Sequence, residues 1–323
     1  MKIGDLTFAP GAALAPMAGF TDAACRRLAA QHGALYTISE MVSAKALTFG
    51  DKKSARLIRA EANGAPYGVQ LFGADPQTMG EGARLLAPYA FDFIDINMGC
   101  PAPKITGGGA GSKLMLDPVL CGQIVREVVQ AAEGRPVTVK MRAGWDADHI
   151  TAVEVARRCE EGGAAAIGVH ARTREQMYTP GIDLEVIRQV KQAVSIPVLG
   201  NGDITSGKEA VEMVQATGCD AVMVGRAALG DPWLFERIAA ALQGQEEPPL
   251  PTLRQRMEAM REQIYQMCEE KGEWAAMPQA RSQALHYMKG LRGAAALRRA
   301  CCSLEHFSDV DALIEQVYRQ QQE

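Results

Sequence analysis

The residues with the clearest chemical potential form a short stretch in which a thiol follows an apolar run. Residues 95–101 read D-I-N-M-G-C-P, so Asn97 and Cys100 come where a strand-like pattern ends. Gly99 lets the backbone approach a ligand closely, and Pro101 stops the strand and fixes the turn. A free cysteine is usually an inert small hydrophobe in a core. The flanking glycine and proline favour instead a thiol presented on a stiff corner.

Two basic side chains lie within other apolar segments. Lys140 interrupts the run 137–141, and His170 follows Val169. An ammonium group buried without a partner carries a large desolvation cost, so Lys140 is interpreted as functional rather than as a side chain that extends to the surface. For His170, a core histidine with satisfied hydrogen bonds is the alternative.

Eight apolar segments of strand length must position these groups, and segments with helical spacing, such as 75–87, 117–132 and 149–161, lie between them. Continuous apolar strands between amphipathic helices indicate a parallel sheet buried on both faces. The sequence therefore predicts an α/β fold, a (β/α)8 TIM barrel with its reactive groups at the carboxyl ends of the strands. A doubly wound open sheet is the alternative, but the turn 16–20 lacks the G-x-G-x-x-G spacing of a dinucleotide site. The eight segments are 14–19, 36–41, 67–73, 95–101, 137–142, 167–172, 197–203 and 221–226.

The chain of 323 residues is longer than a barrel needs, and the surplus lies at its C-terminus. Residues 243–252 are polar and rich in proline, so they predict a linker. Residues 1–242 are expected to form the catalytic barrel. Residues 253–323 are expected to form an all-helical domain, because apolar residues recur there at helical spacing.

Composition restricts the class of protein. The eight cysteines are scattered without a C-x-x-C pair, which favours reduced thiols and predicts no metal site. No apolar run is long enough to cross a bilayer, and the N-terminus lacks a signal-peptide pattern. We therefore expect a cytoplasmic protein that has no membrane association and no obligate protein partner.

The distribution of charge along the chain says more about possible partners than the net charge does. The net charge of −4 argues against a nucleic-acid partner, but residues 281–299 carry five basic residues and no acidic one, with a tyrosine and a histidine among them. This basic segment is either a surface for nucleic acid or an ordinary solvated helix face, and composition leaves both open.

Five motifs in this order resemble those of the bacterial tRNA-dihydrouridine synthase family, and they span nearly the whole chain. They are L-A-P-M-A-G-F-T-D at 14–22, I-D-I-N-M-G-C-P at 94–101, V-K-M-R at 139–142, H-A-R-T-R at 170–174 and N-G-D-I at 201–204. The resemblance implies an oxidoreductase that uses FMN to reduce uridines of tRNA to dihydrouridine, with NADPH supplying the electrons. Whether NADPH is preferred over NADH is left open, because no dinucleotide motif is present.

The same resemblance implies a set of cofactor contacts. Gln70 would meet the pyrimidine edge of the flavin, Lys140 would face the negative charge of the reduced ring, and His170 would lie beside it. Asp203 as a helix cap, Arg226 as a surface cation and Met17 as a core residue are alternatives. The remaining residues implied are Pro16, Met17 and Ala18 along the ring and Asn201, Gly202, Asp203, Gly225 and Arg226 at the phosphate and ribityl chain.

In the family the cysteine is the general acid, so Cys100 is expected to protonate C5 of the uracil, a role that suits a thiol. Asn97 is expected either to bind the uracil edge or to cap the turn. Because a uridine must leave its stack to reach the flavin, the enzyme should hold tRNA broadly. The tRNA contacts expected are Arg172 and Arg174 beside the mouth, where a surface ion pair is the alternative, and Arg281, Lys289 and Arg292 in the helical domain.

Two segments depart from the family pattern. Residues 281–283 read R-S-Q where many relatives carry R-K-H, and the glycine-rich loop 106–113 differs in detail. These differences leave open which uridine is modified and how tightly tRNA is held, and they bear less on the type of reaction.

Two other functions remain open. One is an FMN barrel that acts on a free pyrimidine, such as a dihydroorotate or dihydropyrimidine dehydrogenase, which would need no basic helical domain. The other is a non-catalytic barrel that binds RNA or flavin, against which Cys100 and Lys140 together argue.

Overall fold

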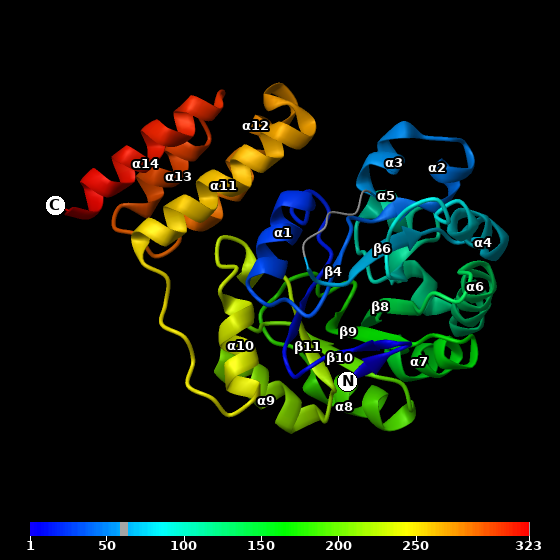
Figure 1. Cartoon of the computed structure of the whole chain (residues 1–323). Coiled ribbons are helices and arrows are strands. Elements are labelled where there is room, and N and C mark those ends of the chain that lie inside the picture. Colours follow the sequence, from blue (N-terminus) through cyan, green and yellow to red (C-terminus); the bar gives the residue numbers. More distant parts are fainter. Residues whose placement is uncertain (59–63, 323) are drawn as a thin grey trace.

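The computed structural model describes residues 1–58 and 64–322 and contains a barrel followed by a bundle of helices (Figure 1). The strands are β1 Lys2–Ile3, β2 Leu6–Thr7, β3 Ala12–Leu14, β4 Thr37–Ile38, β5 Val42–Ser43, β6 Tyr67–Phe72, β7 Phe93–Met98, β8 Val137–Gly144, β9 Ala166–Thr173, β10 Val198–Asn201 and β11 Ala221–Val224. The helices of the barrel are α1 Ala23–Gln31, α2 Ala44–Thr48, α3 Lys52–Leu57, α4 Pro76–Arg84, α5 Pro103–Thr106, η1 Gly111–Leu116, α6 Pro118–Ala131, α7 Ala152–Glu161, α8 Leu184–Ala193, α9 Gly207–Thr217, η2 Arg226–Ala228 and α10 Leu234–Leu242. Four helices follow, α11 Leu253–Lys271, α12 Glu273–Tyr287, α13 Ala294–Cys301 and α14 Phe307–Gln322.

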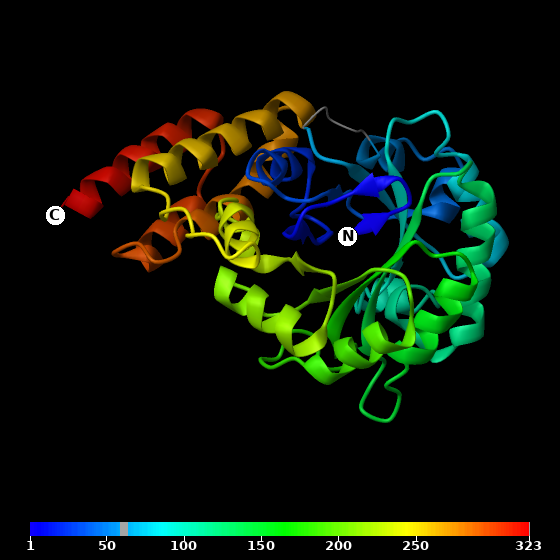
Figure 2. The ribbon, with the colours of Figure 1, turned by 60° about the horizontal axis from the view of Figure 1, so that its bottom comes forward.

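The predicted (β/α)8 barrel is confirmed. Parallel strands follow one another in the order β3-β11-β10-β9-β8-β7-β6-β4, and β5 also pairs with β6, so β4 and β5 share one position of the barrel. The ring closes through Leu35, whose N–H donates to Ala12 O at 2.9 Å, and Leu14, whose N–H donates to Tyr36 O at 3.2 Å. Helices surround the strands, as Figure 2 shows. All strand carboxyl ends therefore meet at one mouth.

The opposite end of the barrel is filled by apolar side chains. Phe8 stacks edge to face on Tyr36, with ring centroids 5.6 Å apart, and Tyr36 stacks in the same way on Phe93 at 5.2 Å. Ile3, from the hairpin β1–β2, belongs to this cluster. These residues form a packed floor, so a ligand can enter only from the mouth.

Two helices of the barrel begin at a capping aspartate that is followed by a proline. Asp75 and Asp117 accept a backbone hydrogen bond from the residue three positions later, and each precedes a proline in the first turn of α4 or α6. A cap of this kind contributes about 1 kcal/mol to helix stability, and proline there loses no helical hydrogen bond. Such caps fix where each loop at the mouth ends.

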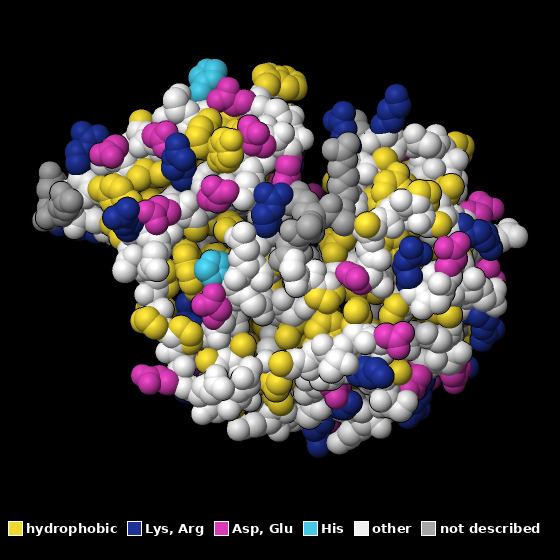
Figure 3. Space-filling model, in the orientation of Figure 1, with side chains coloured by type: hydrophobic (Ala, Val, Ile, Leu, Met, Phe, Trp, Pro, Cys, Tyr) yellow, Lys and Arg dark blue, Asp and Glu magenta, His cyan; other side chains and the backbone are white. Residues whose placement is uncertain are grey.

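The helices α11–α14 have their own core, which includes Met257, Met260 and Ile264 at the predicted spacing. Residues 243–252 carry no helix or strand, although the domain boundaries at 242 and 253 stay a prediction. Glu323, the last residue of the predicted helical domain, lies outside the described residues. The helical region and the segment α2–α3 stand on either side of a notch (Figure 3).

The helical region is attached to the barrel through α1. Ala24 of α1 is buried in the core of the bundle, and Asp22, the cap of α1, forms an ion pair with Lys271 at 2.5 Å. Gln283 Nε2 donates to Phe20 O at 2.8 Å. The bundle is therefore anchored beside the loop that follows β3. Of the helices described, none is both long and apolar enough to span a bilayer.

Candidate active site

The turn that carries Cys100 is held from both sides. Asn97 Oδ1 accepts from the N–H groups of Gly99 at 3.2 Å and Cys100 at 3.0 Å. Cys100 O accepts from both the N–H and the hydroxyl of Ser112, each at 3.0 Å. The thiol itself is half-buried and free. The structure therefore presents Cys100 on a fixed corner at the carboxyl end of β7, and Asn97 caps that corner, which was one of its two expected roles.

A buried polar chain supports this corner from β6 and β7. Gln70 Nε2 donates to Asp95 Oδ2 at 2.7 Å, and Gln70 Oε1 accepts from Asn97 Nδ2 at 2.9 Å. Thr138 of β8 donates its hydroxyl to Asp95 Oδ1 at 2.6 Å. Burial raises the pKa of Asp95 to about 6, although these hydrogen bonds and the charge of Lys140 lower it. The amide of Gln70 is thus fixed in one orientation, because a carboxylate can only accept.

Lys140 is the one residue of β8 that is not fully buried, and it pairs in register with Asn97 and with Gly168 of β9. A Cβ at Gly168 would lie 2.9 Å from Cδ of Lys140, so glycine leaves room for the lysine side chain. Burial, helped by the charge of Arg142, lowers the pKa of Lys140 to about 7, although Asp95 opposes the shift. An ammonium group with this pKa can exist in either protonation state near neutrality.

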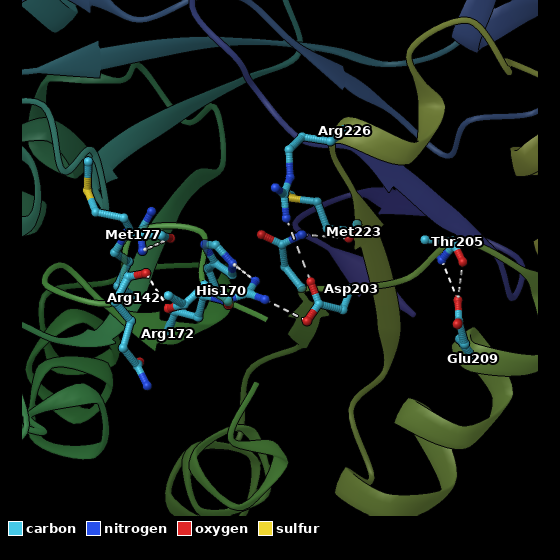
Figure 4. Close-up of polar contacts among 12 residues, drawn as sticks. Arg142, His170, Arg172, Met177, Asp203, Thr205, Glu209, Met223 and Arg226 are labelled. Carbon is cyan, nitrogen blue, oxygen red and sulfur yellow. Dashed lines mark hydrogen bonds and ion pairs between the residues drawn. The ribbon is translucent and has the colours of Figure 1, made fainter. Parts of the chain in front are cut away.

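A second polar group lies at the ends of β9, β10 and β11 (Figure 4). Asp203 forms ion pairs with Arg172 at 2.5 Å and with Arg226 at 3.7 Å. Gly202 has φ +135°, and a Cβ there would lie 2.7 Å from Ile182, so only glycine fits this corner without strain. Asn201 Nδ2 donates to Met223 O at 2.8 Å and fastens β10 to β11. Arg226 stays exposed and is available to an anion at the mouth.

His170 lies beside this group. Its Nε2 is 3.1 Å from Nη1 of Arg172, so the imidazole accepts from the guanidinium and is neutral there. Burial lowers the pKa of His170 far below its usual range, and the charges of Lys140, Arg142, Arg172 and Arg226 add to that effect. A neutral ring can offer its other nitrogen to a ligand.

The first strand brings the loop 16–18 to the same mouth. Met17 N–H donates to the Thr21 hydroxyl at 2.9 Å, and a Cβ at Gly225 would be 3.5 Å from Sδ of Met17. Pro16 and Met17 are half-buried and Ala18 is exposed. The residues expected to contact a flavin ring thus lie next to those expected to contact its phosphate.

Arg172 is placed differently from its expected role as a tRNA contact. Its side chain is 1% exposed, and Nε donates to Thr179 O at 2.7 Å while Nη2 binds Asp203. A guanidinium so enclosed is not at the surface where an RNA phosphate would lie. We therefore assign Arg172 to positioning Asp203 and His170. Arg174 is half-buried, and its guanidinium lies over the ring of Trp145. Among the described residues it does not form the surface ion pair considered as its alternative.

The three residues expected in the helical region differ in accessibility. Lys289 and Arg292 are exposed, whereas Arg281 is half-buried and its Nε donates to Leu304 O at 2.8 Å. Lys289 and Arg292 therefore remain available to an external partner.

Sequence reasoning missed Arg142 as a site residue, although its motif was noticed. Arg142 Nε donates to Gly99 O at 2.8 Å, and Nη1 donates to Thr173 O at 2.9 Å and Met177 O at 3.0 Å. It joins the Cys100 corner to the loop after β9. A cation in an apolar strand, the signal that identified Lys140, would have found it. Asp95 was also missed, although a carboxylate within an apolar strand is a signal of the same kind.

Solved structures with a similar fold are distant in sequence. A variant of NCR from Zymomonas mobilis gives a TM-score of 0.55 at 14% identity, over 79% of this chain and 93% of the other. An amine oxidase from Pseudomonas geniculata gives a TM-score of 0.59 at 17% identity, over 76% of this chain and 49% of the other. These likenesses support the barrel architecture alone.

Sequence comparison is more specific. The chain is 39% identical over 328 residues to a probable tRNA-dihydrouridine synthase of Mycobacterium tuberculosis, covering 98% of this chain and 84% of the relative. It is 44% identical over 253 residues to tRNA-dihydrouridine synthase B of Xanthomonas axonopodis pv. citri, covering 78% and 76%. It is 37% identical over 322 residues to tRNA-dihydrouridine synthase B of Pseudomonas aeruginosa, covering 100% of this chain and 97% of the relative. A family model described as dihydrouridine synthase matches residues 13–322. The chain belongs to the dihydrouridine synthase family.

Proposed function

We propose that this protein is a flavin-dependent oxidoreductase that reduces the C5=C6 bond of uridines in tRNA to dihydrouridine. The relatives named above support the reaction. The observation that carries the proposal is the fixed corner of Cys100, whose strand pairs with β8 so that Asn97 lies in register with Lys140. A proton donor and a cation thereby come from adjacent strands at one mouth.

FMN is the cofactor that suits the donor set at this mouth. The corner at Gly202 and the exposed Arg226 suit a phosphate, whereas the neutral His170, Lys140 and the oriented amide of Gln70 suit the polar edges of a ring. When bound, FMN would supply the hydride. The residues that would hold it are Pro16, Met17, Ala18, Gln70, Lys140, His170, Asn201, Gly202, Asp203, Gly225 and Arg226.

Cys100 would supply the proton. Reduction adds a hydride to C6 and a proton to C5 of the uracil, and the thiol of Cys100 gives up that proton and becomes a thiolate. Asn97 keeps the Cys100 backbone in place through the two N–H groups that it caps. Arg142, which binds Gly99 O, brings a positive charge near the thiolate that forms.

The substrate is proposed to be tRNA rather than a free base. The exposed Lys289 and Arg292 of the helical region could contact tRNA phosphates, while one extruded uridine enters the mouth. A free-pyrimidine dehydrogenase would need no such region. We further propose NADPH or NADH as the reductant and the cytoplasm as the location.

The test is to reduce the flavin-loaded protein anaerobically with NADPH and then add tRNA that lacks modification. Rapid reoxidation, with a uridine that gains two hydrogens by mass spectrometry, is expected. Reoxidation by uracil or orotate but not by tRNA would identify the free-pyrimidine enzyme instead, and a protein that binds no flavin would exclude both.

Cys100→Ala separates the two half-reactions. Because Cys100 is proposed to donate a proton only to the uracil, C100A should bind flavin and be reduced by NADPH at the wild-type rate but form dihydrouridine about 100-fold or more slowly. Lys208→Gln, which removes an exposed charge on α9, should leave both steps unchanged. A C100A enzyme with wild-type product formation would remove Cys100 from the mechanism.

A further inference from the structure

A cluster of two cations and one aromatic ring lies on the rim of the mouth and has no role in the proposed chemistry. Lys113 Nζ is 4.7 Å from the ring centroid of Trp145, and Cζ of Arg174 is 4.8 Å from the same centroid. We call Lys113, Trp145 and Arg174 the rim clamp. Both cations are close enough to the ring for a cation–π interaction.

The rim clamp is built by the loops of the active site. Lys113 lies in η1, next to Ser112, which binds Cys100 O. Trp145 and Arg174 directly follow Gly144 and Thr173, the last paired residues of β8 and β9. These are the strands that carry Lys140 and His170. The clamp is therefore fixed relative to the thiol by the same hydrogen bonds that fix the mouth.

The backbone around Trp145 is also tied down. Arg174 N–H donates to Gly144 O at 2.9 Å, Glu175 N–H donates to Trp145 O at 3.0 Å, and Trp145 N–H donates to His149 O at 3.0 Å. The ring thus stands on a braced segment, and it orders two long side chains that would otherwise lose rotamer freedom only when a ligand binds.

The charges of the clamp are not neutralised. Among residues 1–58 and 64–322, neither Lys113 nor Arg174 forms an ion pair, and Nε of Arg174 is buried without a hydrogen-bond partner. The nearby Asp146 binds His149 at 2.6 Å instead. Two cations held on one ring, neither of them in an ion pair among the described residues, favour an anion beside them.

We propose that the rim clamp binds the RNA backbone next to the extruded uridine, with Lys113 and Arg174 on phosphate oxygens and Trp145 holding both cations in place. This inference rests on the proposed tRNA substrate. A guanidinium that stacks by its face keeps its N–H edge free for a phosphate. Phosphates of NADPH present the same chemistry, so the test must separate the two.

The variants are K113Q, R174Q and their combination, with K208Q as the matched surface control. We expect the double variant to raise the KM for tRNA about tenfold, from the loss of charge-assisted contacts, while kcat stays within a factor of about two. The dependence of log KM on log salt should become shallower by about 1.4, because two phosphate contacts to a single strand are lost. Reduction by NADPH alone should be unchanged.

Trp145→Leu tests the ordering role. It should raise the KM for tRNA severalfold without changing the salt slope, because the charges remain, whereas Trp145→Phe should retain most of the affinity. Flavin content reports whether each variant is folded.

A KM for tRNA within twofold of wild type in the double variant would overturn the clamp. Slower reduction by NADPH with unchanged tRNA kinetics would assign the cations to the reductant. Direct tRNA binding, measured by fluorescence anisotropy, separates a failure of this inference from a failure of the proposed reaction. If the wild type binds no tRNA, the proposed function fails. If the wild type binds tRNA and the variants bind it equally well, the clamp alone fails.

Discussion

Lys140 and Asp95 lie on adjacent strands, and each carries a charge that burial disfavours. Burial lowers the pKa of Lys140 to about 7 and raises that of Asp95 to about 6, so each shift moves the group toward its neutral form. Their mutual attraction opposes both shifts. The charge state of this pair is therefore adjustable near neutral pH, as a site that handles negative charge requires.

Stability should depend on pH through Lys140. The unfolded chain keeps this proton up to a pKa near 10.5, whereas the folded protein releases it near 7. Between those values the unfolded state binds more protons, so the free energy of unfolding rises with pH. From pH 7 to about pH 9, we expect it to rise by roughly 2 kcal/mol more in the flavin-free wild type than in Lys140→Met.

Urea unfolding at the two pH values measures this difference. Lys208→Met, which removes an exposed lysine, should keep the wild-type pH dependence. An equal rise in the wild type and K140M would mean that folding does not lower the pKa of Lys140.

The sequence predicted which residues belong to the site better than it predicted their hydrogen-bond partners. Cys100 and Lys140 were identifiable because a thiol between glycine and proline, and a lysine within an apolar strand, conflict with a purely structural role. The link from Asp95 through Gln70 to Asn97 was not, because it joins residues of two strands whose register depends on the whole sheet. Arg172 was expected at the surface because its buried partner, Asp203, follows a different strand and could not be identified from the sequence pattern.

Glycines set the shape of the elements around the thiol. Gly111 begins η1 with φ +62°, and a Cβ there would lie 2.6 Å from Cys100 O. That carbonyl accepts both hydrogen bonds of Ser112. The start of η1 and the Cys100 corner are thus in direct contact, and neither can shift alone.

Gly111→Ala should therefore impair catalysis as well as stability. The comparison is Gly134→Ala, since Gly134 has φ +84° but nothing within 4 Å of an added Cβ. G134A should lower the free energy of unfolding by about 1 kcal/mol, the cost of a left-handed conformation. G111A should cost more and should slow dihydrouridine formation, while flavin reduction by NADPH proceeds.

Thermal unfolding and single-turnover product formation measure the two effects. Equal losses in G111A and G134A would show that only backbone strain matters and that the corner tolerates the methyl group.

The elements themselves were largely predictable. Apolar segments separated by helical spacing define a parallel sheet, and the eight expected positions are occupied. Two segments differ. Of the segment 14–19, only Leu14 lies in a strand, β3. The segment 36–41 contains β4, and β5 follows it at Val42–Ser43, because Ser39 Oγ accepts from Gln70 N–H at 2.9 Å and interrupts the ladder. A serine that replaces a backbone partner cannot be distinguished by pattern from one that merely ends a strand.

The barrel and the helical region meet across a polar contact. Asp22 is 6% exposed at its side chain and binds Lys271, which also binds Gln279 Oε1 at 2.6 Å. The sequence predicted two regions but not this attachment, since the partners lie 249 positions apart. The contact fixes the position of the exposed basic residues of the helical region relative to the mouth.

Lys271→Gln should weaken this attachment. Losing one partner of a buried charge leaves Asp22 desolvated, so the free energy of unfolding should fall by about 1–3 kcal/mol. Arg254→Gln breaks the exposed pair with Glu258 and should lower the free energy of unfolding much less than K271Q does.

Differential scanning calorimetry measures both variants. If K271Q and R254Q had the same effect, the attachment of the helical region would not depend on the Asp22–Lys271 pair.

The closure of the barrel between its first and last strands has a consequence for biosynthesis. Ala15 N–H donates to Val224 O at 2.8 Å, so the first strand of the barrel pairs with a segment that the ribosome makes some two hundred residues later. At ~5–20 residues per second, the nascent first strand waits on the order of 10–40 s for that neighbour. Until then its apolar edge is exposed to chaperones and to other chains.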